Sequence, residues 1–168
     1  MTDKFQILPL YKDALLRIKH LVSGENNEFS GCIYSDGSFS IKEGNENSAV
    51  AADSHFIWHS HPDGKLLFSL NDYLCIFYSK AQYAALFAGN KILVIKKTAI
   101  HKKIYLEFRE IASQFQGCSS IIYYKFIQLI EKYFNIDATA DINEETLSKL
   151  KFKFSIYKEA DLKLISEA

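Results

Sequence analysis

Apolar residues recur along this chain with two periods, and each period predicts one kind of secondary structure. A spacing of three and four residues is typical of one helix face, and it begins with Ala14, Leu15, Ile18, Leu21 and Val22. The same spacing predicts further helices at residues 70–80, 105–115, 121–134 and 143–150. Alternating or continuous apolar runs predict strands at residues 28–35, 38–42, 54–61, 83–88, 91–97 and 152–157. The expected fold class is therefore α/β, with helices around a mixed sheet.

Short turn and cap signals separate these segments. Asp36-Gly37 and Gly89-Asn90 predict hairpin turns, and Pro62 ends the strand before it because proline cannot donate to a strand ladder. Ser119 or Ser120 is the expected N-cap of the long helix that follows. These boundaries thus coincide with residue types that favour a turn or a cap.

Length and composition favour one compact domain of residues 1–168. The chain has 168 residues, of which 48% are hydrophobic, and 20 acidic side chains balance 20 basic ones. A net charge of zero argues against nucleic acid or an anionic membrane surface as a partner. No apolar stretch approaches the roughly 20 residues of a spanning helix, and the N-terminus carries acids where a signal peptide carries bases. We expect a soluble, cytoplasmic protein whose cysteines, Cys32, Cys75 and Cys118, are reduced and buried.

Candidate chemistry is concentrated in residues 59–72, which read HSHPDGKLLFSLND. His59 and His61 are two residues apart on a predicted strand, so both imidazoles project from the same face. Asp72, in the first turn of the next predicted helix, could supply a third ligand. Three protein ligands with a fourth position left for water are typical of a catalytic zinc centre, in which the metal lowers the pKa of water to about 7.

This segment resembles the JAMM (MPN-plus, JAB-domain) metalloprotease family, whose motif is His-x-His-Pro, seven residues, and then Ser-x-x-Asp. Ser69 and Asp72 follow His61 at that spacing, a pattern expected by chance in on the order of one in 10⁵ chains of this length. The family also has an upstream Glu-x-x-Gly, which Glu28-Phe29-Ser30-Gly31 matches. Many members have proline where this chain has Phe68. The resemblance covers about residues 10–98 and leaves a C-terminal extension of about residues 100–168.

The resemblance implies a fold, a reaction and a role for each motif residue. The fold would be the cytidine-deaminase-like MPN/JAB fold, a mixed β-sheet flanked by helices, with extra C-terminal helices. His59, His61 and Asp72 would bind Zn²⁺, Glu28 would be the general base, and Ser69 would stabilise the oxyanion. The implied protein is a zinc metallopeptidase that cleaves amide or isopeptide bonds at the C-terminus of a ubiquitin-like or sulfur-carrier-like modifier.

Other interpretations of the same residues stay open. Ser69 and Asp72 also have the spacing of a helix capping box, and both roles can hold together. Glu28 could instead be a solvent-facing carboxylate at a strand edge, with Glu25 as the second choice for the base. At the level of function, the alternatives are a non-catalytic MPN-type scaffold and a small-amide or cell-wall or phage-type peptide hydrolase. The pattern leaves the oligomeric state open.

Overall fold

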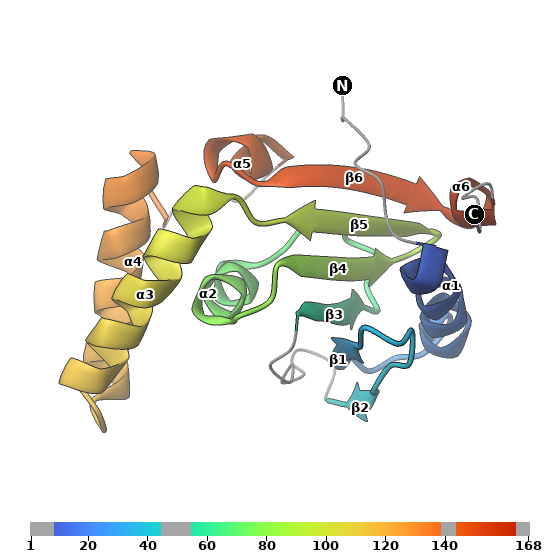
Figure 1. Cartoon of the computed structure of the whole chain (residues 1–168), viewed down its shortest axis with the longest axis horizontal. Coiled ribbons are helices and arrows are strands. Elements are labelled where there is room, and N and C mark those ends of the chain that lie inside the picture. Colours follow the sequence, from blue (N-terminus) through green and yellow to red (C-terminus); the bar gives the residue numbers. More distant parts are fainter. Residues whose placement is uncertain (1–8, 45–54, 139–143, 164–168) are drawn as a thin grey trace. The chain divides into compact units, whose positions relative to one another are not determined.

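The computed structural model describes residues 9–44, 55–138 and 144–163, which form an α/β structure (Figure 1). These residues divide into two compact units. The first unit contains described residues 9–44, 55–66, 81–96 and 154–163, and the second contains 67–80, 97–138 and 144–153.

The first unit is built on a six-stranded sheet with the strand order β2-β1-β3-β4-β5-β6. Its strands are β1 (Phe29–Ile33), β2 (Lys42–Glu43), β3 (Phe56–His61), β4 (Tyr83–Ala88), β5 (Lys91–Lys96) and β6 (Lys153–Lys158). β3 and β4 pair in parallel, whereas the pairs β1–β2, β1–β3 and β4–β5 are antiparallel. The predicted mixed sheet is therefore confirmed.

A helix formed by the first apolar pattern packs on this sheet. α1 (Pro9–Val22) buries Ala14, Leu15 and Ile18 in one core cluster with Phe56 and Trp58 of β3. Because side chains alternate along a strand, Phe56 and Trp58 share one face of β3, and Ile57 and the two histidines share the other. A second short helix, α6 (Glu159–Lys163), contributes the buried Leu162 to the same cluster.

The second unit consists mainly of helices packed through aromatic rings. Its helices are α2 (Leu70–Tyr78), α3 (Ala99–Gln114), α4 (Ser119–Phe134) and α5 (Glu144–Lys149). Phe108 of α3 stacks on Phe126 of α4, with ring centroids 3.9 Å apart. His101 is fully buried here, and its ring stacks on the ring of Phe152 with centroids 4.1 Å apart.

Several predicted boundaries were wrong. The strand expected at residues 38–42 is reduced to an isolated bridge between Ile33 and Phe39, followed by the two-residue β2. The reason is local, because the Asp36 carboxylate accepts hydrogen bonds from both the amide and the hydroxyl of Ser38 and so stabilises a turn where the strand would begin. The N-cap of α4 is Cys118, not Ser119 or Ser120.

Other differences concern helices, cysteines and the ends of elements. α3 begins at Ala99, six residues before the expected start, because the buried His101 occupies the apolar face together with Ile104 and Phe108. α6 was not predicted. Cys75 and Cys118 are exposed, whereas Cys32 is buried and all three are free thiols. The predicted ends at Ser54 and Asn143 lie outside the described residues.

Each of the two units is assembled from segments that lie far apart in the chain. α2, which begins just after the motif serine, belongs to the second unit, whereas β6 and α6 from the end of the chain belong to the first. None of the helices in the described segments combines the length and the apolar character that a membrane crossing needs.

Candidate metal centre

Two histidines lie side by side at the end of β3 in the first unit. His59 and His61 project from the same face of the strand, and both are half-buried. Their ring centroids are 4.9 Å apart, and one ring nitrogen of each lies within 4.8 Å of the other. The Nε2 atom of His59 is shielded from solvent. Two imidazoles in this arrangement are half of the ligand set of a catalytic zinc site.

A backbone hydrogen bond orients the second of these rings. Nδ1 of His61 lies 3.0 Å from the carbonyl oxygen of Lys65, in the loop that follows β3. A carbonyl only accepts, so Nδ1 carries the proton in this bond, and the neutral ring then presents its lone pair at Nε2. Metal-binding histidines commonly donate their other ring N–H to a carbonyl or carboxylate in this way, which fixes both tautomer and orientation.

Glu28 directly precedes β1, the strand that pairs with the histidine strand β3. Ser30 pairs with His59, and the amide of Phe29 donates to the hydroxyl of Ser60 across 2.9 Å. Glu28 lies just before β1, and the antiparallel register, if continued to it, would set Glu28 opposite His61. Glu25 precedes the strand and is exposed. Of the two candidate bases, Glu28 is the one that adjoins β1, the strand paired with the histidine strand.

The glycine of the Glu-x-x-Gly segment has a steric explanation. Gly31 lies in β1, and a Cβ atom added to it would overlap the carbonyl oxygen of Ser40 and approach Nε1 of Trp58 to 2.9 Å. Any side chain at this position would push the segment around Ser40 away from β1. Gly31 therefore allows the polypeptide after β1 to fold back closely against the strand that begins next to Glu28.

Ser69 and Asp72 form the predicted capping box at the start of α2, in the second unit. The Asp72 carboxylate accepts from the amide of Ser69 at 2.8 Å, and the Ser69 hydroxyl accepts from the amide of Asp72 at 3.1 Å. Burial, together with the negative charge of Asp72, raises the pKa of Tyr73 above its usual value. The capping interpretation is therefore confirmed, and it holds both side chains in defined positions.

The five motif residues thus fall into two groups. His59 and His61 meet on one face of β3 in the first unit, where Glu28 directly precedes the neighbouring β1. Ser69 and Asp72 meet at the helix start in the second unit. The carbonyl of Lys65 and the hydroxyl of Ser60, which position the first group, carry no signal in the sequence, because any residue has a carbonyl and a serine is common on strands.

Comparison of the chain with protein-family models, with curated proteins and with solved structures found no match.

Proposed function

We propose that this protein is a zinc-dependent metallopeptidase of the JAMM type with an MPN/JAB fold. In this proposal it hydrolyses an amide or isopeptide bond at the C-terminus of a ubiquitin-like or sulfur-carrier-like modifier. The observation that carries the proposal is the pair of histidines that share one face of β3, beside the strand that Glu28 directly precedes. The substrate class rests on the motif resemblance alone.

The donor set fits zinc. His59 and His61 offer imidazole nitrogens, and the hydrogen bond from His61 Nδ1 to the Lys65 carbonyl leaves the tautomer that coordinates through Nε2. Asp72 is the proposed third ligand, and only ten residues separate it from His61 along the chain. Its cap contact to the Ser69 amide uses Oδ2, and a carboxylate has a second oxygen with which to bind a metal. Bound zinc would activate water near neutral pH and polarise the substrate carbonyl.

Glu28 and Ser69 have the remaining roles in this proposal. Glu28 accepts a proton from the attacking water and later donates it to the departing amine, so the amine leaves without charge. The Ser69 hydroxyl accepts a hydrogen bond from the Asp72 amide through a lone pair. Its O–H can then donate to the substrate carbonyl oxygen, which gains negative charge as water attacks. The helix cap holds that donor in place before the reaction begins.

Metal analysis tests the ligand assignment. Protein purified without chelator should contain about one zinc per chain, and His59→Ala should lose most of it. His55→Ala is the matched control, because His55 is exposed, precedes β3 and packs its ring against Tyr83. Full zinc content in His59→Ala, or equal loss in His55→Ala, would show that the ligands were assigned wrongly.

A cleavage assay with a panel of modifier fusions tests the reaction. Glu28→Gln should retain zinc and lose about 10²- to 10⁴-fold in rate, because the amide cannot accept the proton. Glu110→Gln on the exposed face of α3 should be unaffected. Zinc without cleavage of any fusion or peptide would favour the non-catalytic scaffold, and cleavage of short peptides alone would favour the cell-wall or small-amide alternative.

A further inference from the structure

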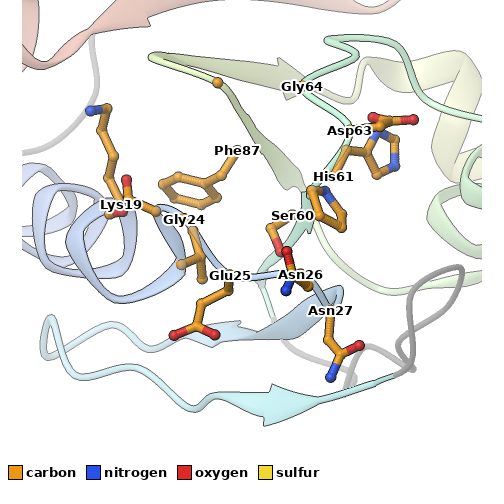
Figure 2. Close-up of a pocket in the computed structure, with 14 residues that line it drawn as sticks. Lys19, Gly24, Glu25, Asn26, Asn27, Ser60, His61, Asp63, Gly64 and Phe87 are labelled. Carbon is orange, nitrogen blue, oxygen red and sulfur yellow. Dashed lines mark hydrogen bonds between the residues drawn. The ribbon is translucent and has the colours of Figure 1, made fainter.

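A five-residue turn after β3 contains both the second histidine of the candidate metal centre and the carbonyl that orients its ring. Residues 61–65 read His-Pro-Asp-Gly-Lys, and His61, Asp63 and Gly64 are among the residues that line the pocket in Figure 2. The hydrogen bond between His61 Nδ1 and the Lys65 carbonyl closes within this segment. Whatever fixes the position of Lys65 therefore also fixes the direction of the His61 ring.

Two further hydrogen bonds hold this turn together. The Gly64 amide donates to the His61 carbonyl at 3.1 Å, and the Lys65 amide donates to the Asp63 carboxylate at 2.9 Å. The first bond joins positions i and i+3 of a β-turn, and Pro62 occupies position i+1, where its fixed φ fits. The second is the contact that an aspartate commonly makes with the amide two residues later. The peptide groups on both sides of Gly64 are therefore hydrogen-bonded.

Gly64 is needed for its backbone conformation and not for space. Its φ is +76°, and a Cβ atom added to it would meet no atom within 4 Å. A residue with a side chain is strained at such a φ. The chain reverses at this glycine, and the Lys65 carbonyl just beyond it accepts from the His61 ring.

We propose that Asp63 is a positioning residue for zinc binding. By holding the Lys65 amide, its carboxylate places the Lys65 carbonyl where it orients the His61 ring and keeps the ring proton on Nδ1. Nε2 then presents its lone pair before a metal arrives, so less ordering remains to be done on binding. The role in zinc binding rests on the proposed function, whereas the effect of the turn on the ring does not. Asp63 is exposed, so its carboxylate is not part of the core.

The same unit contains a second Asp-Gly turn, which provides a matched control. The Asp36 carboxylate accepts from the Ser38 amide at 2.9 Å, and Gly37 between them has a φ of +87°. This turn follows β1, and the end of β1 pairs with the start of β3, away from the two histidines. Removal of Asp36 thus breaks the same kind of bond as removal of Asp63, but at the other end of β3.

Zinc competition with a chromophoric chelator measures the metal affinity of each variant. Asp63→Ala should weaken zinc binding about tenfold, the low end of the range for residues that support a metal ligand, because Asp63 acts through one further contact. Asp63→Asn keeps an acceptor oxygen and should bind zinc within about twofold of the unaltered protein, since asparagine forms the same turn. Asp36→Ala should leave the zinc affinity unchanged. Equal weakening in Asp63→Asn and Asp63→Ala would show that charge acts here and would overturn the proposal.

The ring nitrogens of His61 provide a readout that needs neither zinc nor substrate. In chelator-treated protein at about pH 9, where imidazoles are neutral, ¹⁵N NMR shows which ring nitrogen holds the proton, and His61→Ala identifies the signals. The proton should be on Nδ1 in the unaltered protein, in Asp63→Asn and in Asp36→Ala. In Asp63→Ala a substantial share should move to Nε2, the nitrogen that free neutral histidine prefers to protonate.

Gly64→Ala tests the same turn through its backbone. The added methyl group has room, so a loss must come from the strained φ. We expect weaker zinc binding and a shift of the His61 proton in the same direction as in Asp63→Ala. Gly89→Ala is the matched control, because Gly89 has a φ of +59° and equal space but lies between β4 and β5.

These measurements separate the proposal from the proposed function. If the protein binds no zinc and cleaves nothing, but the His61 proton moves in Asp63→Ala, the turn orients the ring and the peptidase proposal fails. If the protein is a zinc peptidase whose Asp63→Ala variant keeps full zinc affinity, the peptidase stands and Asp63 has no positioning role. Equal loss of zinc affinity in Asp36→Ala and Asp63→Ala would also overturn the proposal, because the effect would then be general.

Discussion

Ser69 has a structural role that is confirmed and a catalytic role that is proposed, and substitutions at this one position separate the two. Ser69→Ala removes the acceptor for the Asp72 amide and the proposed oxyanion donor together. Ser69→Asp keeps an acceptor oxygen at the helix cap but replaces the donor by a negative charge. Ser69→Thr keeps both the acceptor and the hydroxyl and serves as the control.

The expected magnitudes follow from the cap geometry. The 3.1 Å bond from the Asp72 amide to the Ser69 hydroxyl satisfies one of the donors at the start of α2. Losing it in Ser69→Ala should cost about 1 kcal/mol, or about 2–4 °C in melting temperature for a chain of this size. Ser69→Asp and Ser69→Thr should melt close to the unaltered protein. The turnover rates of Ser69→Ala and Ser69→Asp should each fall about 10²-fold or more, because removal of one oxyanion donor typically slows a reaction by that factor.

The assay is a melting temperature and a single-turnover cleavage rate on the same protein samples, with zinc content measured for each. The reasoning predicts that stability and rate separate in Ser69→Asp, which should be stable, loaded with metal and slow. If Ser69→Asp cleaves as fast as the unaltered protein, or if the rates of all three variants simply follow their stabilities, Ser69 caps the helix and does nothing else.

Two further predictions concern stability. Burial lowers the pKa of His101 from 6.5 to about 4. As the pH falls, the imidazole is therefore protonated in the unfolded chain before it is protonated in the folded protein. The free energy of unfolding should fall by about 3 kcal/mol as the pH drops from about 6.5 to about 4. Chemical denaturation at several pH values should show a shallower acid dependence for His101→Gln than for the unaltered protein, and an identical dependence would exclude His101 as the cause. Gly31→Ala should destabilise the protein by about 1–3 kcal/mol, because the added Cβ overlaps the Ser40 carbonyl. Thermal melting would contradict this if the variant were as stable as the unaltered protein.

The sequence by itself determined those features that depend on residues close together in the chain. His59 and His61 share a face because strand side chains alternate, and Ser69 and Asp72 form a capping box because three residues span one helical turn. The mixed sheet was expected for the same reason, since each apolar run marks its own strand. None of these predictions needed knowledge of what lies opposite in space.

Only the tertiary structure decided the features that depend on distant residues. It paired β1 with β3, which joins residues about 30 positions apart and brings the strand that begins next to Glu28 beside the two histidines. It also joined β6 to the first unit and buried His101, whose Nε2–H donates to the Leu150 carbonyl at 2.7 Å. Strand pairing and core packing set these outcomes, because backbone partners and buried contacts are made by the whole fold and leave no local pattern in the chain.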